Sequence, residues 1–184
     1  MYFVYNLLFF SKPFEDISPE EIQKVFGVNV YSQFWMLSEF LPDLKSAPNG
    51  GHLVCICSTA GLTGTSNLTA YCSTKYALNG LMEAIQHEYR DMHPTGRLKM
   101  TTVYPATINT GLAKKSYTRF PWLVPLLEAK DASKQILEAV QRNERKVYLP
   151  PQLEPMFCIN HVIPHKLSDV LQHFIGVGVH PHSD

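Results

Sequence analysis

Residues 52–58 read His-Leu-Val-Cys-Ile-Cys-Ser, a short run of β-forming residues that follows the turn cluster at residues 46–51. An apolar run of this length without alternation is typical of an interior strand of a parallel sheet, buried on both faces. Helical spacing follows over residues 73–89, and a second strand is predicted at residues 98–104. Strand, helix and strand in this order indicate a right-handed parallel crossover. The sequence therefore predicts an α/β fold with a parallel sheet.

A long amphipathic helix is predicted upstream of this unit. Ser18 suits the N-cap position, Pro19 suits the first turn, and the two glutamates that follow favour the positive end of the helix dipole. Apolar side chains then recur at steps of three and four: Ile22, Val25, Phe26, Val30, Phe34, Leu37 and Leu41. Asn29 falls inside this apolar stripe. A polar amide there costs free energy unless it is hydrogen-bonded, so Asn29 requires an explanation.

The remaining segments complete a single domain over residues 1–184. A helix is predicted at residues 129–143 and a short strand at residues 146–149. Residues 1–10 form an atypical apolar start that is too short for a membrane span of about 20 residues, so we expect a buried strand or an irregular start, with membrane contact as the alternative. The apolar tail at residues 152–184 is broken by prolines, and a substrate lid, a dimer contact and a membrane-surface segment all remain open.

Composition narrows the classes of function. Sixteen basic and sixteen acidic residues cancel, so no overall field favours nucleic acid as a partner. The four cysteines are too few and too unevenly placed for a disulfide framework, and we expect them to be reduced. His161 with His165 and His180 with His182 lack an accompanying carboxylate or cysteine constellation, so no metal site is expected.

The strongest chemical signal is Tyr71-Cys72-Ser73-Thr74-Lys75, preceded by Ser58 at the end of a predicted strand. At a spacing of four, Tyr71 and Lys75 share one helix face, where an ammonium stabilises a phenolate. A free tyrosine has a pKa of about 10, so we expect Lys75 and the helix N-terminus to lower it. Ser58 lies where open α/β sheets place their binding crevice. Its hydroxyl is therefore expected to hold a substrate oxygen while Tyr71 exchanges the proton.

This pattern resembles the short-chain dehydrogenase/reductase family, in which a serine, a tyrosine thirteen residues later and a lysine four beyond it form the active site. The resemblance extends over residues 11–149 and includes Val28-Asn29-Val30, the serine segment at residues 57–61 and the loop at residues 105–111. It implies a Rossmann-type parallel sheet with flanking helices. It also implies a catalytic set of Asn29, Ser58, Tyr71 and Lys75, in which Ser58 binds the substrate as well.

The resemblance implies further roles around a nicotinamide cofactor, NAD or NADP. Asn29 would help to hold a proton-relay water near Lys75, and Tyr71 and Lys75 would contact the cofactor, with Lys75 on the nicotinamide ribose. Ile108 would offer backbone groups to the carboxamide, and Thr110 would reach the phosphates. Ala106 stands where the family usually has a glycine, a change expected only to crowd the backbone.

A narrower resemblance is to the membrane-associated branch of the family, of the 16C type, which includes retinol dehydrogenases and hydroxysteroid dehydrogenases. It is carried by Phe34-Trp35, by residues 51–61 and by Asn109-Thr110-Gly111. It implies a retinoid- or steroid-like alcohol or ketone as substrate, and a location at the endoplasmic reticulum membrane surface or a lipid droplet, with the cytoplasm otherwise. The apolar segment at residues 120–127 suits the family's substrate-covering loop.

The start of the chain departs from the family pattern. The family opens with a Thr-Gly-x-x-x-Gly-x-Gly turn whose backbone amides hold the pyrophosphate, whereas the first glycine here is Gly27. Residues 1–10 are therefore expected to replace the first nucleotide-binding βαβ half. The alternative to an active oxidoreductase is a catalytically inactive remnant. Such a remnant would act as a homodimer, or with a full-length relative, through the helices at residues 22–41 and 73–89.

Overall fold

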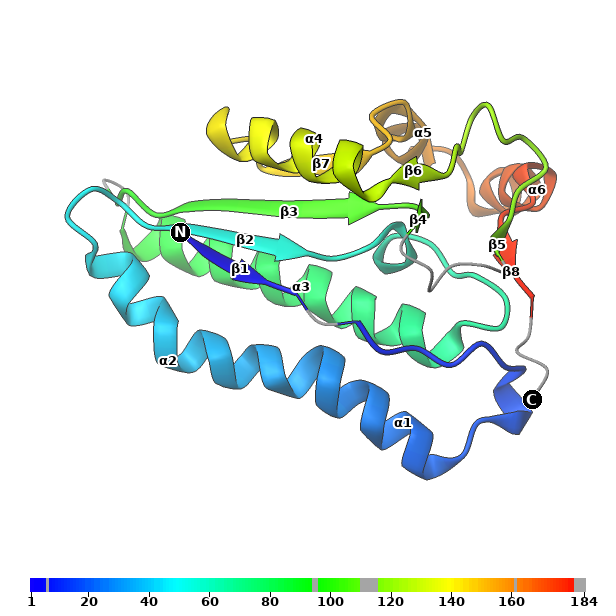
Figure 1. Cartoon of the computed structure of the whole chain (residues 1–184), viewed down its shortest axis with the longest axis horizontal. Helices are drawn as coiled ribbons and strands as arrows, with labels where there is room; N and C mark the ends of the chain where they lie inside the picture. Colours follow the sequence, from blue (N-terminus) through cyan, green and yellow to red (C-terminus); the bar gives the residue numbers. More distant parts are fainter. Residues whose placement is uncertain (6, 94–95, 110–115, 161, 181–184) are drawn as a thin grey trace.

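A parallel sheet of four strands forms the centre of the molecule, with helices on both of its faces (Figure 1). The computed structural model describes all residues of the chain except 6, 94–95, 110–115, 161 and 181–184. The strands lie in the order β1 (Tyr2–Val4), β2 (His52–Ile56), β3 (Lys99–Pro105) and β7 (Lys146–Leu149). All neighbouring pairs are parallel. The predicted α/β fold is confirmed.

Strand β2 is buried on both faces, as its composition predicts. The main helices are α1 (Pro19–Phe26), α2 (Ser32–Ser46), α3 (Thr69–Met92) and α4 (Ala129–Gln141). Leu53 and Cys55 pack with side chains of α2 and α3, whereas Val54 packs with side chains of α4 on the opposite face. Successive side chains of a strand point to opposite faces, so an apolar run without alternation supplies both cores.

The predicted amphipathic helix is interrupted by a π-helical turn at Gly27–Tyr31. Ser18 and Glu21 form the predicted N-terminal cap, since each side chain bonds the backbone N–H of the other residue. A π turn holds an extra residue, which rotates the buried face of the helix that follows. Gln33 is therefore buried, whereas Phe34 is 51% exposed. The prediction that Phe34 belongs to the buried stripe is wrong for this reason.

Segments close to both ends of the chain reach the carboxyl end of the sheet (Figure 1). After the edge strand β1, residues 7–13 continue towards the start of α1 without regular structure apart from a bend. The tail forms α5 (Leu153–Asn160), α6 (His165–Ile175) and β8 (Gly178–Val179). Strand β8 pairs antiparallel with β5 (Ser116–Tyr117), beyond the tips of the central strands (Figure 1). The tail thus lies against the region where an open α/β sheet places its site.

Candidate active site

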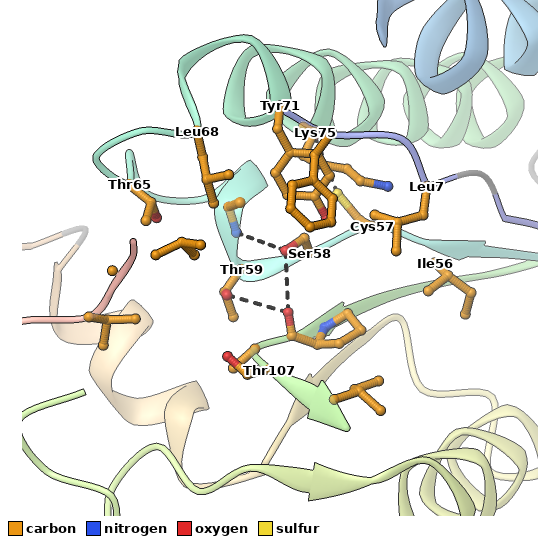
Figure 2. A pocket seen from close by; sticks show the side chains of 18 of the residues that line it. Leu7, Ile56, Cys57, Ser58, Thr59, Thr65, Leu68, Tyr71, Lys75 and Thr107 are labelled. Carbon is orange, nitrogen blue, oxygen red and sulfur yellow. Dashed lines mark hydrogen bonds between the residues drawn. The ribbon is translucent and has the colours of Figure 1, made fainter. Parts of the chain in front are cut away.

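Ser58, Tyr71 and Lys75 line one cavity of about 180 Å³, which we call the inner cavity (Figure 2). Ser58 follows the carboxyl end of β2, and the other two residues lie in the first turns of α3. The Lys75 Nζ atom is 5.5 Å from the centroid of the Tyr71 ring. The structure therefore brings together the three residues that the sequence pattern selects.

The Ser58 side chain is held by backbone groups on two sides. Its Oγ accepts a hydrogen bond from Ala60 N–H at 3.1 Å and donates to the carbonyl of Pro105 at 3.4 Å (Figure 2). The short helical turn after Ser58 packs tightly on α3, because a Cβ at Gly61 would lie 2.7 Å from the carbonyl oxygen of Lys75. A glycine is therefore needed at position 61 to bring the serine segment up to the helix that carries Tyr71 and Lys75.

Burial shifts the proton equilibria of this cluster towards the neutral forms. Burial raises the pKa of the Tyr71 phenol, and a hydrogen bond with Ser58 opposes the rise only in part. Burial also lowers the pKa of the Lys75 amine, which is 1% exposed, while Cys57 and Cys55 act in the opposite direction. The predicted net lowering of the Tyr71 pKa is therefore wrong for this chain alone. Both charged forms lose hydration in the same cavity, and for Tyr71 this cost exceeds the gain from the hydrogen bond with Ser58.

Asn29 is fully buried, and its amide finds partners on two segments. Its Oδ1 accepts from Leu8 N–H at 2.9 Å, and its Nδ2 donates to the Leu8 carbonyl at 2.7 Å and to Thr74 Oγ1 at 3.1 Å. These bonds explain the polar residue in an apolar stripe, since they tie the initial segment to helix α3. The proton-relay water near Lys75 stays a prediction.

Several residues of the inner cavity were not predicted from sequence. Tyr5, Leu7 and Phe9 line it from the initial segment, and the Phe9 ring lies 5.7 Å from the Tyr71 ring between centroids. Their alternation is typical of an extended segment that presents one side, a signal that was available in the sequence. Val177 and Val179 close the cavity from the tail. No local pattern indicated that the tail reaches the site.

The part of the tail that closes the cavity is anchored at several points. The side-chain amide of Asn67 donates to the carbonyl of Val179 at 3.0 Å, and Ser11 Oγ donates to the carbonyl of His180 at 2.9 Å. Ser11 is fully buried at this contact. The two terminal segments thus meet over the site and together form one of its walls.

The predicted cofactor-binding residues are only partly placed. Ile108, on the short strand β4 (Ile108–Asn109), lines the inner cavity together with Thr107. Thr110 lies outside the described residues. The donor set of the inner cavity includes a lysine amine, a phenol and a serine hydroxyl. These groups fit the hydroxyl-rich nicotinamide ribose of a dinucleotide.

A second cavity of about 530 Å³, which we call the outer cavity, adjoins the inner one. The two share Thr59, Thr65, Ala106 and Val177 as walls. The lining of the outer cavity is largely apolar and comes from residues 120–124 and from helices α5 and α6. The segment predicted to cover a substrate therefore faces this space. An apolar chamber that opens beside hydroxyl and amine groups suits a lipophilic molecule with one reactive polar end.

Comparison with known proteins agrees with this arrangement. The family model described as short chain dehydrogenase matches residues 9–119. Human epidermal retinol dehydrogenase 2 is 35% identical over 167 residues, which are 91% of this chain and 53% of that protein. Estradiol 17-beta-dehydrogenase 11 of Rattus norvegicus is 32% identical over 85% of this chain and 51% of its own length. The chain thus spans about half the length of the curated relatives it matches.

Solved structures agree in fold at lower sequence identity. A short chain dehydrogenase from Burkholderia cenocepacia in complex with NADP superposes with a TM-score of 0.73 at 19% identity, over 94% of this chain and 69% of that one. A short chain dehydrogenase/reductase from Burkholderia phymatum in complex with NAD gives 0.70 at 20% identity, over 96% and 67%. The predicted similarity to retinol and hydroxysteroid dehydrogenases is confirmed by the curated relatives.

Proposed function

Because the chain belongs to the short chain dehydrogenase family, we propose that it takes part in the nicotinamide-dependent interconversion of a lipophilic alcohol and its carbonyl compound. The observation that carries this proposal is the convergence of Ser58, Tyr71 and Lys75 on the inner cavity, which adjoins an apolar outer cavity. A polar reacting end and an apolar body would each find a matching environment.

Proton transfer in this proposal belongs to Tyr71. In oxidation its phenolate accepts the hydroxyl proton of the alcohol, and in reduction its phenol returns that proton. Ser58 holds the substrate oxygen through its hydroxyl, which the backbone groups of Ala60 and Pro105 keep in place. Lys75 stabilises the phenolate when the lysine amine is protonated. A nicotinamide cofactor supplies or accepts the hydride when bound.

The nicotinamide end of the cofactor would be held by Lys75 and Tyr71, with backbone groups at Ile108. This assignment is supported by the cavity that the three residues share. Thr110 is proposed to reach the phosphates, as the family resemblance implies. NAD and NADP differ only at the ribose of the adenosine end, so the residues at the nicotinamide end would hold either one.

A retinoid- or steroid-like substrate is supported by the lining of the outer cavity and by the names of the relatives. A location at a membrane surface or a lipid droplet is supported by exposed apolar side chains around the same cavity: Trp122, Ile159, Leu171, Phe174 and Val177. Such a face would allow a lipophilic compound to enter from a lipid phase. Among the described residues, no helix is both long and apolar enough to cross a membrane.

A second candidate function is a non-catalytic one that depends on dimerisation. It is favoured by exposed aromatic side chains on the helix formed by α1, the π turn and α2, since Tyr31, Phe34 and Trp35 are each more than half exposed. Exposed aromatic groups close together are typical of protein interfaces. The partner would be a second copy of this chain or a full-length relative.

Cofactor binding separates the two candidates. The purified chain is titrated with NAD, NADH, NADP and NADPH, and the midpoint of thermal unfolding is followed. At a ligand concentration 100 times the dissociation constant, the gain is about 2.7 kcal/mol, which moves the midpoint by several degrees. Lys75→Met is expected to abolish the shift, whereas Lys99→Met, at an exposed lysine, leaves it in place.

Absence of a shift with all four dinucleotides would contradict the oxidoreductase proposal and favour the dimer. A shift that survives Lys75→Met would show that a dinucleotide binds elsewhere on the chain. Because Lys75 is buried, the circular dichroism of the variant is compared with that of the unchanged chain before its binding is interpreted.

A further inference from the structure

The outer cavity is mostly apolar, but one part of its wall carries polar side chains from three segments. Thr63 follows the short turn after Ser58, Asn160 ends helix α5, and Gln172 lies on helix α6; all three line the cavity. Ser168 of α6 bonds to two of them and is 5% exposed. The buried Ser168 hydroxyl needs hydrogen-bond partners, whereas Gln172 is exposed and Thr63 and Asn160 are partly exposed.

The four side chains form a hydrogen-bond chain with one direction. Thr63 Oγ1 donates to Gln172 Oε1 at 2.9 Å, and Gln172 Nε2 donates to Ser168 Oγ at 3.1 Å. Ser168 Oγ in turn donates to Asn160 Oδ1. Every proton in the chain points towards Asn160. The chain therefore ends on the Asn160 amide nitrogen, which carries two N–H donors.

The two N–H donors of the Asn160 amide stand at the end of this hydrogen-bond chain. Among the described residues, no acceptor is hydrogen-bonded to Asn160 Nδ2, although its Oδ1 is engaged by Ser168. An amide nitrogen that lines an apolar cavity is therefore suited to a ligand that brings an acceptor oxygen into that cavity.

We propose that Asn160 binds an oxygen atom of the ligand at a distance from its reacting carbinol, so that the outer cavity selects lipophilic compounds with oxygen at both ends. This inference rests on the proposed function, because it places the reacting oxygen at Ser58 and Tyr71 and the second oxygen at Asn160. It favours a steroid-like diol or hydroxyketone over a retinoid-like alcohol that carries one oxygen. A site built to bond a second oxygen discriminates against the analogue that lacks it.

The alternative role for the hydrogen-bond chain is to hold α5, α6 and the segment at Thr63 together. That role makes a different prediction: loss of any one of the three hydrogen bonds should have a similar effect, whichever ligand enters the cavity. Thr63→Val removes the first link but leaves the Asn160 donors in place. Asn160→Leu removes the donors while keeping a side chain of similar size. The two variants therefore separate ligand recognition from helix joining.

Binding can be followed without turnover, through Trp122. The sequence has two tryptophans, and Trp122 lines the outer cavity whereas Trp35 is an exposed residue of α2. In a Trp35→Phe background, the fluorescence of Trp122 reports on occupancy of the outer cavity. The ligands are 5α-androstan-17β-ol, which has one hydroxyl, and 5α-androstane-3β,17β-diol, which has two. A third ligand, 17β-hydroxy-5α-androstan-3-one, offers only an acceptor at the distal end.

The diol and the hydroxyketone are expected to bind about fivefold more tightly than the monool, the ratio that one net hydrogen bond provides. Asn160→Leu should remove this preference while the monool still binds. Thr63→Val and Asn49→Leu, the latter in an exposed turn, should retain it. An unchanged preference in Asn160→Leu, or no preference in the unchanged chain, would overturn the proposal.

The same ligands distinguish this inference from the proposed function. A preference for the diol without oxidation of either alcohol in the presence of NAD or NADP would support the binding site and contradict the catalytic role. Oxidation of both alcohols with equal dissociation constants would support the catalytic role and overturn the inference. Loss of the preference in Thr63→Val but not in Asn160→Leu would assign the second oxygen to Thr63 instead.

Discussion

Tyr71 shows how burial and a neighbouring charge compete at a single residue. The phenol lies on a cavity wall, where burial raises its pKa, and the lysine one turn away is itself buried with a lowered pKa. Burial thus disfavours the charged form of each group. The chain alone favours neutral tyrosine, and any gain in acidity has to come from groups that bind in the cavity.

Tyr71→Phe is expected to reduce alcohol oxidation by at least about 100-fold, because general acid–base catalysis contributes that much or more. Because the pKa of Tyr71 is raised, the phenolate fraction in the protein without the substitution continues to increase at pH values above 10.0, the ordinary pKa of tyrosine. The logarithm of kcat/KM for oxidation should rise with pH as long as the phenol is mainly protonated, and the variant should lose this slope. Kinetics at several pH values with a saturating dinucleotide provide the measurement.

Tyr76→Phe is the matched control, because Tyr76 is an exposed tyrosine on the same helix and does not line either cavity. It should keep both the rate and the pH slope. Full activity in Tyr71→Phe would refute the assignment of the base, provided that the variant binds the dinucleotide with an unchanged dissociation constant.

The junction between α2 and β2 depends on close contact between two backbone segments. A Cβ at Gly51 would lie 2.3 Å from the carbonyl oxygen of Leu44, and backbone atoms cannot move aside as a flexible side chain can. Gly80 on α3 is the opposite case, since a Cβ there would meet nothing within 4 Å. The two glycines therefore have opposite effects on stability, although they look alike in the sequence.

Gly51→Ala is expected to lower the free energy of unfolding by about 1 to 3 kcal/mol, the usual cost of forcing atoms into a packed region. Gly80→Ala should raise it by roughly 0.5 to 1 kcal/mol, because alanine is the better residue inside an exposed helix. Urea unfolding followed by circular dichroism measures both. Equal effects of the same sign would show that the contact at Leu44 does not constrain the junction.

The whole molecule encloses its site with segments from both ends of the chain and buries several ionisable groups beside it. Burial raises the pKa of Tyr104 as well as that of Tyr71. The Tyr104 hydroxyl also donates to Asn79 from inside the core. Both tyrosines are therefore held protonated by the folded state. This preference links the stability of the protein to pH on the alkaline side.

Stability is expected to fall as pH rises above 10.5. The unfolded tyrosines lose their protons near the ordinary pKa of 10.0, whereas the folded ones keep them, so the unfolded state binds fewer protons in this range. Each tyrosine lowers the free energy of unfolding by up to about 1.4 kcal/mol per pH unit. Lys75 has the opposite effect, because its lowered pKa makes stability rise with pH. This rise ends once the amine of the unfolded state, with a pKa of 10.5, has lost its proton.

Urea unfolding at pH 8, 10.5 and 11.5 measures the expected decline. Tyr104→Phe should make the decline less steep, since it removes one buried phenol with a raised pKa, whereas Tyr71 and Tyr148 remain. Tyr31→Phe, at an exposed tyrosine of the π turn, should leave the slope unchanged. A free energy of unfolding that stays constant from pH 10.5 to 11.5 would contradict the burial of these phenols.

Local sequence determined the strands, most helix positions and the placement of Ser58, Tyr71 and Lys75. Residues 52–58 supply an interior strand because apolar side chains on both faces leave no other stable environment. The spacing of Tyr71 and Lys75 places them on one helix face through helical geometry alone. Ser58 follows from its place at the end of a strand. These features depend on short-range periodicity, so they can be predicted from the sequence alone.

Only the tertiary structure decided the walls of the site and the proton equilibria within it. The π turn moved Phe34 to the surface and Gln33 into the core, although Leu37, one turn later, stays in the core as the apolar stripe predicts. The tail reached the inner cavity through bonds to Ser11 and Asn67, which are more than one hundred residues away in the sequence. Burial, which depends on the whole fold, then outweighed the hydrogen bond with Ser58 and raised the pKa of Tyr71.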